Sequence, residues 1–276
     1  HQMQNALAVL LADDGEQDPA VLATLLSFPG SAELESLQSV ADPLALYLAA
    51  CTLREQFGRA LAKPLQRRLE MLQSHWAQPW PAGQGERQLT GLIWSWLSAA
   101  GDQAVRQQAL DAVSGPSMTM ARYALRALQP HDCQERELAL GCFHDRWQER
   151  PVIFDSWFGL EASTPRADGL AQVHALLNHP RFDPMAPNAV RAVLGGLAGN
   201  PVVFHAADGE GYRFMAEQII AVDQRNAITA SRLAKVFSRW RFYSETRQHQ
   251  VKQALGLLEA ADLSTNTREV VAMMLA

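Results

Sequence analysis

The chain has 276 residues, of which 48% are hydrophobic and 19% are charged, and its formal net charge at pH 7 is -5. The apolar content is enough for a sizeable core and excludes a disordered chain. The acidic balance, with a pI near 5.9, argues against nucleic-acid binding, which requires a clustered excess of Lys and Arg. No stretch approaches the roughly 18 apolar residues of a membrane span, so we expect a soluble protein without a membrane partner.

Three cysteines, Cys51, Cys133 and Cys142, are scattered along the sequence and form no CxxC pair. An odd number of scattered thiols predicts reduced core residues rather than disulfides or a metal site, and it favours a reducing, cytoplasmic location. The chain begins with His1 rather than Met and has no signal-peptide pattern. We therefore expect a domain excised from a larger protein.

Apolar residues recur at helical spacing almost throughout the chain, whereas alternation over the length of a strand is nearly absent. After the break at Gly115-Pro116, apolar residues fall at i, i+3, i+7 and i+10, which predicts a helix with one buried face. The apolar positions of this helix are Met118, Ala121, Leu125 and Leu128.

Two short apolar runs, 151–154 and 201–204, look strand-like in isolation. In the first run and the residues after it, Phe154, Trp157 and Phe158 have i, i+3, i+4 spacing, so a helix is predicted there.

Polar residues at the expected starts of helices give further boundaries toward the C-terminus. Asp168 can cap one helix and Asn188 can begin another, because both precede apolar residues at helical spacing. A further apolar stripe covers residues 251–258, and Ser264 is the expected N-cap of the last helix.

Short polar turns and Pro or Gly breakers separate these helices, without a low-complexity linker or a repeat of fixed period. The predicted fold is therefore all-α, an irregular superhelical stack of helix pairs similar to an armadillo or HEAT α-solenoid. No clean boundary divides the chain, so one helical domain covering residues 1–276 is expected.

The sequence lacks the residue patterns of known catalytic sites. No H-E-x-x-H zinc motif occurs, and the one close histidine pair, His174 and His179, is five residues apart and is followed by Pro180. His144 beside Asp145 can form a local pair. We expect no catalytic residue and no metal ligand in this chain, and these histidines are interpreted as surface or hydrogen-bonded groups.

Nucleophile and phosphate-binding motifs are also absent. Two glycine-rich pieces, at residues 195–199 and 208–212, are interpreted as helix ends and tight turns. The tryptophans are interpreted as core or inter-helix packing residues rather than a stacking platform for bases or sugars. They include Trp94, Trp96, Trp147, Trp157 and Trp240.

One segment, from Arg225 to Arg247, is strongly basic and contains Glu245 as its only acid. Within it, Arg232, Lys235 and Arg239 fall at i, i+3 and i+7, which predicts that they share one face of a helix opposite an apolar side. This pattern allows two interpretations. The face is a solvated cationic surface, or it lines a groove that binds an anionic group such as a peptide carboxylate.

Several strings in the second half resemble, in the same order, the C-terminal domain of bacterial aminopeptidase N, of the gluzincin zinc aminopeptidase family. The main strings are Asn200 to Tyr212, Ala230-Ser231-Arg232-Leu233, Arg239 to Tyr243 with Arg247-Gln248, Arg146-Trp147, Asp155 to Phe158, and Ala162 to Pro165. Asp18-Pro19-Ala20 and Asp42-Pro43-Leu44 fit the same family near the start. The resemblance covers essentially the whole chain.

This resemblance implies stacked helix pairs that close over a thermolysin-like zinc domain and wall off a substrate cavity. It places the catalytic residues and the zinc in preceding domains of the same polypeptide, with no cofactor in this chain. Arg232 matches an arginine that faces the substrate cavity in family members, so we expect Arg232, Lys235 and Arg239 to line that cavity. Ile228 and Thr229 depart from the polar pair that relatives can carry.

Two functions remain open at this point. The first is a non-catalytic C-terminal domain of a zinc metalloaminopeptidase of cytoplasmic peptide catabolism, with the preceding catalytic and β domains and a peptide substrate as partners. The second is a stand-alone α-solenoid scaffold that binds a protein or peptide along its concave face. An enzyme in its own right is disfavoured, because the metal and nucleophile arrangements are missing from the sequence.

Overall fold

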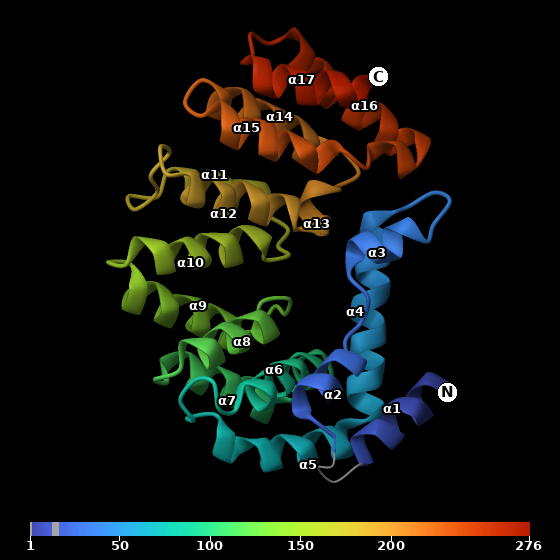
Figure 1. Ribbon diagram of the computed structural model, residues 1–276, viewed down its shortest axis with the longest axis vertical. Coiled ribbons are helices and arrows are strands. Elements are labelled where there is room, and N and C mark those ends of the chain that lie inside the picture. Colours follow the sequence, from blue (N-terminus) through green and yellow to red (C-terminus); the bar gives the residue numbers. More distant parts are fainter. Residues whose placement is uncertain (1, 13–16) are drawn as a thin grey trace. The chain divides into compact units, whose positions relative to one another are not determined.

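The computed structural model describes residues 2–12 and 17–276 (Figure 1). In these ranges the regular elements are α-helices and short 3-10 helices, and the β structure is an isolated bridge between Ala41 and Tyr243. The predicted all-α class is confirmed. None of the helices in these ranges is long and apolar enough to cross a membrane. The chain forms two compact units, and each is described by itself.

Unit 1 consists of His1–Pro29 and Leu48–Arg146. Its helices are α1 (Gln2–Ala12), α2 (Pro19–Leu25), most of α4 (Pro43–Ala60), α5 (Ala62–Leu72), η1 (Gln73–His75), α6 (Gln84–Ala99), α7 (Gln103–Ser114), α8 (Met118–Leu128) and α9 (Gln134–Trp147) as far as Arg146. Helix α6 is central, because α2, α5, α7 and α8 all pack against it. Its side chains Ile93, Trp94 and Leu97 have no exposed surface.

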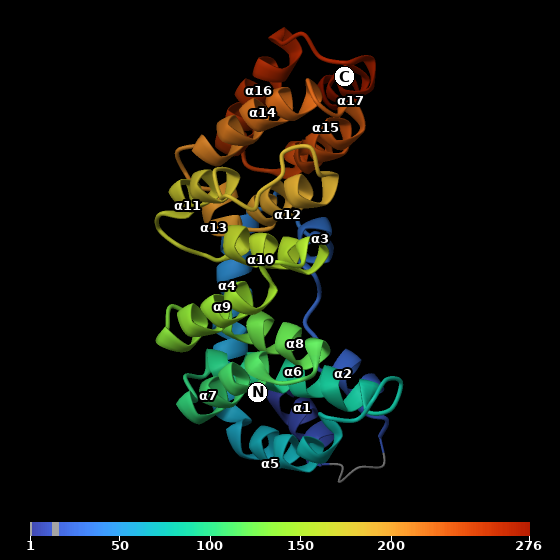
Figure 2. The same ribbon diagram turned by 90° about the vertical axis from the view of Figure 1, so that its left-hand side faces the viewer.

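Unit 2 consists of Gly30–Tyr47 and Trp147–Ala276. Its helices are α3 (Ser31–Ser36), the start of α4, α10 (Pro151–Ser163), α11 (Gly169–Leu177), α12 (Pro187–Ala198), α13 (Pro201–Phe204), α14 (Glu210–Asp223), α15 (Ala227–Ala234), η2 (Lys235–Phe237), η3 (Trp240–Phe242), α16 (Glu245–Ala260) and α17 (Thr265–Leu275). Helices α14 and α15 form one pair and α16 and α17 the next, with α14 against α16 and α15 against α17 (Figure 2).

Helix caps occur where the sequence predicts them, with two differences of detail. Ser117 and Ser264 cap α8 and α17, each accepting a hydrogen bond from a backbone N–H of the first turn. Asp168 holds the N-cap position of α11, but its carboxylate pairs with Arg166 instead of capping. Helix α12 begins at Pro187, one residue before the expected Asn188, because proline is well suited to the first helical position.

The two strand-like runs are both helical. The prediction for the first is confirmed, since it begins α10. The second is the single turn α13, which Pro201 starts and which leaves Val203 and Phe204 buried. Proline fixes φ near the helical value and lacks the N–H that a strand ladder needs, so the turn is the better solution for this run.

Large aromatic side chains form much of the core, as expected: Trp94, Trp96, Trp157 and Trp240 are all buried. The cysteines are free, but the expectation that they are core residues is wrong, because Cys142 is exposed and the other two are half-buried. On α9 the neighbours Ala139, Leu140 and Phe143 already fill the buried face, and Cys142 lies outside that face. The expected single domain stays a prediction.

The interpretation of the glycine-rich piece at residues 195–199 as a helix end holds for one of its glycines and is wrong for the other two. Gly195 and Gly196 lie inside α12, and Gly199 is its C-cap. A Cβ at Gly196 would come 2.8 Å from the carbonyl oxygen of Gly159 in α10 and from Cβ of Ala162. The missing side chain therefore allows α10 and α12 to approach closely. The piece at 208–212 does contain a tight turn, since Gly209 has φ of 74°.

Replacing Gly196 by Ala tests this close approach. We expect Gly196→Ala to lower the free energy of unfolding by about 1–3 kcal/mol, because the added methyl group overpacks the contact between α10 and α12. Gly195→Ala is the matched control, since nothing lies within 4 Å of a Cβ at this neighbouring position. That change should be neutral or stabilise by about 0.4–1 kcal/mol. Urea unfolding measures both, and equal effects would contradict the packing argument.

Candidate functional site

The first part of the basic segment forms α15, and the α-helix does not continue to the end of the segment. Asn226 caps α15 by accepting a hydrogen bond from the N–H of Thr229 at 2.9 Å. The helix ends at Ala234, and the 3-10 helices η2 and η3 follow. The prediction of one helical face carrying all three cations is therefore wrong. Three-residue turns keep Phe237 and Trp240 on the buried side, and the helical register is lost there.

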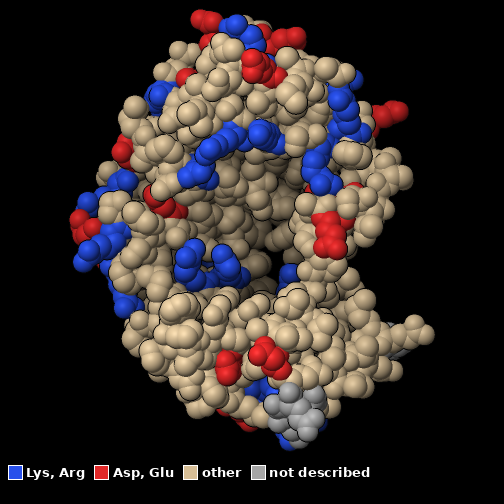
Figure 3. Space-filling model, in the orientation of Figure 1, with Lys and Arg blue, Asp and Glu red and all other residues tan. Residues whose placement is uncertain are grey.

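Arg232 and Lys235 are exposed at the C-terminal end of α15. Cations at this end of a helix interact favourably with its dipole. In the part of the chain that the structure describes, neither side chain has an ion-pair or hydrogen-bond partner. Figure 3 shows Lys and Arg side chains gathered on the face of unit 2 around α15. These two residues are available to an external anion.

Arg239 lies between η2 and η3 and forms an ion pair with an acidic residue that is far away in the sequence, Glu35. Its Nε is 2.9 Å from Oε2 of Glu35, and the side chains are 34% and 10% exposed. Neither atom makes a well-aligned hydrogen bond. The pair is thus held mainly by charge attraction, and Arg239 differs from Arg232 and Lys235 in having a partner within the protein.

Glu35 belongs to a segment of unit 2, Gly30–Tyr47, which we call the strap. The strap meets the end of the basic segment through the N–H of Ala41, which donates to the carbonyl of Phe242 at 2.6 Å. One residue further, Asp42 Oδ1 accepts a hydrogen bond from Arg247 Nη2 at 3.2 Å. These partners are 205 residues apart in the sequence. No local pattern predicts such contacts, so the sequence did not reveal Glu35, and it indicated Asp42 only as part of a string that fits the family, without a partner.

Arg247 also donates to the backbone carbonyl of His205, which joins the strap to a buried pair. Nδ1 of His205 lies 2.6 Å from the hydroxyl of Tyr212, and both side chains are buried. Burial, and then the charge of Arg247, lowers the pKa of His205 to about 4. Burial raises the pKa of Tyr212. Both groups are therefore neutral at pH 7, and their contact is a structural hydrogen bond between enclosed side chains.

The string from Asn200 to Tyr212 is largely explained by packing. Asn200 is 1% exposed, and its Nδ2 donates to the carbonyl of Thr164 at 2.8 Å. Gly209 provides the left-handed conformation before α14. A Cβ at Gly211 would be 2.6 Å from the carbonyl oxygen of Val203, so α13 and α14 touch backbone to backbone there.

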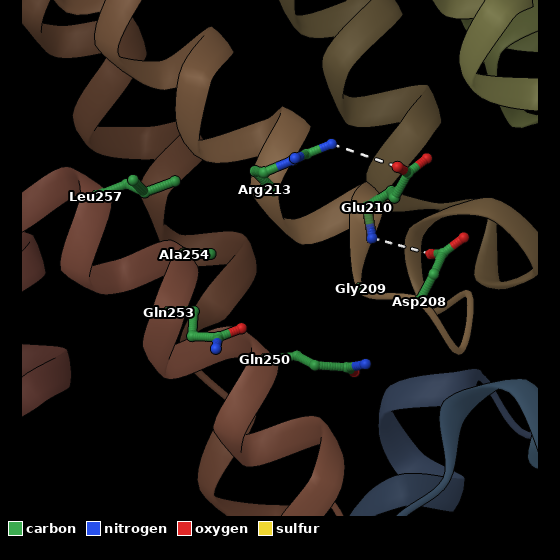
Figure 4. Close-up of a pocket in the computed structure, with 8 residues that line it drawn as sticks. All are labelled: Asp208, Gly209, Glu210, Arg213, Gln250, Gln253, Ala254 and Leu257. Atoms are coloured by element: carbon green, nitrogen blue, oxygen red, sulfur yellow. Dashed lines mark hydrogen bonds and ion pairs between the residues drawn. The ribbon is translucent and has the colours of Figure 1, made fainter.

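An open groove of about 400 Å³ lies between the start of α14 and one side of α16 (Figure 4). It is lined by Asp208, Gly209, Glu210, Arg213, Gln250, Gln253, Ala254 and Leu257. Asp208 Oδ1 accepts from the N–H of Glu210 at 2.9 Å, and Arg213 pairs with Glu210 at 3.3 Å. The charged groups at the rim of the groove therefore already have partners within the protein: Asp208 accepts a hydrogen bond at the start of α14, and Arg213 pairs with Glu210.

The histidines singled out in the sequence lie in separate surroundings. His174 packs edge-on against Phe214, and His179 packs against the aromatic rings of α10. His144 pairs with Asp145 at 2.9 Å, as expected. In residues 2–12 and 17–276, no three His, Cys, Asp or Glu side chains come together in a way that could hold a metal ion. The described residues do not fit a zinc site.

Comparison with known proteins gives a consistent family assignment. A family model described as a domain of unknown function (DUF3458_C) with ARM repeats matches residues 1–276. The description agrees with the predicted armadillo-like solenoid. Aminopeptidase N of Caulobacter vibrioides is 32% identical over 98% of this chain, and that of Escherichia coli is 31% identical over 98%.

The chain spans about a third of the length of these relatives, 32% and 31% respectively. It is also similar to a crystal structure of Legionella pneumophila aminopeptidase A in complex with aspartic acid. That similarity has a TM-score of 0.88 and 26% identity, and it covers 99% of this chain and 33% of the other.

Removing Arg239 should destabilise the protein, because it leaves the carboxylate of Glu35 enclosed without a counter-charge. We expect Arg239→Ala to lower the free energy of unfolding by about 1–3 kcal/mol, discounted for the partial exposure of the arginine. Lys235→Ala, which removes an exposed cation without a partner, should change it by less than about 0.5 kcal/mol. Urea unfolding measures both. If Glu35→Gln did not relieve part of the Arg239→Ala effect, the pair would not be the cause.

The buried His205 should make stability fall in acid. Its pKa is about 4 in the folded protein against the ordinary histidine value of 6.5, so between these pH values the unfolded chain binds more protons. The contribution of His205 to the free energy of unfolding is fully present above pH 6.5 and is lost as the pH falls toward 4. The loss amounts to about 3 kcal/mol. His205→Gln should flatten the dependence of the unfolding free energy on pH in this window relative to the unsubstituted protein. An unaltered slope in this variant would exclude His205 as its source.

Proposed function

The chain belongs to the DUF3458_C family of ARM-repeat domains, the C-terminal domain of aminopeptidase N, and from this we propose that it is the non-catalytic domain of a zinc aminopeptidase. The observation that carries the proposal is the match to two aminopeptidases N over 98% of this chain, within only a third of their length. The reaction, removal of N-terminal amino acids from peptides in the cytoplasm, then belongs to the whole polypeptide. The zinc and its ligands lie in a preceding domain.

In this role the helical stack closes over the catalytic domain and forms the wall of the substrate cavity. The wall admits peptides and excludes folded proteins, so selection is by size as well as by contact. Arg232 and Lys235 supply positive charge without an internal partner, and a guanidinium can hold a carboxylate in bidentate fashion. Arg239 contributes to the same lining through the part of its side chain that remains exposed beside Glu35.

Exposed apolar side chains on the first two helices support contact with preceding domains. Helix α1 exposes Met3 and Val9, and α2 exposes Val21 and Leu25, each with more than half of its surface accessible. Apolar side chains exposed in this number on two short helices are typical of surfaces that another part of a protein covers. We place the preceding β and catalytic domains of the same polypeptide over these residues.

Peptidase assays on the parent enzyme test the proposal. Arg232→Ala should raise KM for peptides about tenfold or more, since a hydrogen bond to a charged group contributes about 1.5–3 kcal/mol. Cleavage of a chromogenic aminoacyl substrate, which has no distant carboxylate, should change little. Arg225→Ala, an exposed arginine of the same segment, is the control and should leave both activities unchanged.

The isolated chain supplied with zinc should be inactive in the same assay. Turnover by the isolated chain would overturn the non-catalytic role. Equal effects of Arg232→Ala on peptides and on the small substrate would remove Arg232 from the substrate-facing wall. A parent polypeptide without peptidase activity would leave the scaffold function in its place.

A further inference from the structure

Unit 1 contains a second group of arginines, in which two side chains reach the same end of α6. A Cβ at Gly58 would lie 2.2 Å from the carbonyl oxygen of Trp96, so α4 touches α6 at this point. Arg54 is one helical turn before Gly58 and therefore lies on the same face of α4. Its Cζ is 5.6 Å from the ring centroid of Phe28, and that ring stacks on Trp96 at 5.3 Å.

Arg106, in the first turns of α7, is fixed to the same part of α6. Its Nε and Nη2 donate to the carbonyl of Ser98 at 3.1 and 2.6 Å. These two bonds orient the guanidinium and leave the N–H groups of Nη1 without a partner in the described ranges. Ser98 is fully buried, and its Oγ also has no hydrogen-bond partner.

Neither Arg54 nor Arg106 has an acidic partner in the described part of the chain. The nearby Arg136 shows the contrast, because it pairs with Asp132 at 2.9 Å and with Glu137 at 2.7 Å. Cations that serve only to stabilise a fold are usually balanced in this way when they are partly buried. Arg54 and Arg106 are instead half-buried and unbalanced.

His131, in the loop between α8 and α9, lies within the field of these arginines. Burial, and then the charges of Arg106, Arg54 and Arg136, lowers the pKa of His131 to about 4. Asp132 in this loop and Glu137 in the first turn of α9 pair with Arg136, and neither is among the charges that act on His131. Glu135, also in the first turn of α9, acts together with Arg106 on the thiol of Cys133 and is likewise not among the charges that act on His131. At pH 7 the ring is therefore neutral beside an excess of positive charge.

We propose that Arg54 and Arg106, with the ring of His131, form a binding site for an oxyanion, the carboxylate or phosphate group of a small ligand. The free N–H groups of the two guanidiniums provide forked donors that match such a group, and the half-buried setting reduces screening by water. The fixed Arg106 and the ring-stacked Arg54 are oriented before a ligand arrives, which limits the entropy lost on binding. The site lies in unit 1, and it does not depend on the proposed function.

Binding can be followed on His131 itself, by NMR of its ring in the full 276-residue chain. Added inorganic phosphate should shift the His131 signals saturably at pH 7, and it should raise the pKa of His131, because the anion offsets the neighbouring positive charges. Arg54→Ala should weaken the apparent affinity tenfold or more, and Arg54→Lys should restore only part of it. Arg126→Ala, an exposed arginine of the same unit whose charge does not act on His131, should have no effect.

Parallel titrations with a tripeptide and with its C-terminal amide identify the source of the oxyanion. Binding of the acid but not the amide assigns the site to a peptide carboxylate, whereas binding of phosphate alone assigns it to a phosphate group. Circular dichroism checks that each variant folds. The proposal is overturned if no probe shifts His131 saturably, or if Arg54→Ala and Arg126→Ala respond alike.

Discussion

Backbone-to-backbone contact between helices occurs at several glycines of the described residues, among them the following three. Gly58 brings α4 onto α6, Gly196 brings α12 onto α10, and Gly211 brings α14 onto α13. A helix in a stack can bury its apolar stripe only against its neighbours, so the spacing of neighbouring helices controls how much surface is removed from water. Where that spacing is smallest, no side chain fits between the helices. The outward faces carry no such restriction, and the exposed Arg232 and Lys235 lie on one of them.

Within unit 2, local stacking alone does not account for the position of the strap. The strap comes early in the sequence, yet Ala41 is hydrogen-bonded to Phe242 and Asp42 to Arg247 near the end of the chain. Since loop closure of this length costs conformational entropy, the contacts must be strong enough to offset it. Burial adds an electrostatic requirement to these contacts. The buried carboxylate of Glu35 needs a nearby positive charge, and the buried His205 beside Arg247 must remain neutral.

Most helices could be predicted from the sequence because their determinants are local. Ser117 and Ser264 act within three residues of their positions, and apolar spacing identifies α8, α10 and α16. The change to 3-10 turns after Ala234 could not be predicted, since it depends on how Phe237 and Trp240 are buried.

The candidate site divides in the same way. That Arg232 and Lys235 are exposed follows from the local pattern of the basic segment. The ion pair of Arg239 depends on Glu35 in the strap, which is distant in the sequence, and no spacing rule connects the two residues. Nor did the pattern of apolar residues reveal the arginines of unit 1, because their contacts are tertiary. Arg54 lies over the ring of Phe28, and Arg106 is bonded to the carbonyl of Ser98.

The most recognisable string of the sequence, Asn200 to Tyr212, consists largely of residues that packing requires: a buried amide, a left-handed glycine, a close backbone contact and a buried His–Tyr pair. The resemblance that this string carries is therefore explained mainly by the fold. Arg232 is different, because it is exposed and has no internal partner, and neither packing nor hydrogen bonding explains why an arginine is needed there. Function is best sought where the structure leaves a charged side chain without a structural reason, and among the described residues of the basic segment that criterion selects Arg232 and Lys235. In unit 1, Arg54 and Arg106 do have structural contacts, with Phe28 and with the carbonyl of Ser98, but neither contact balances their charge.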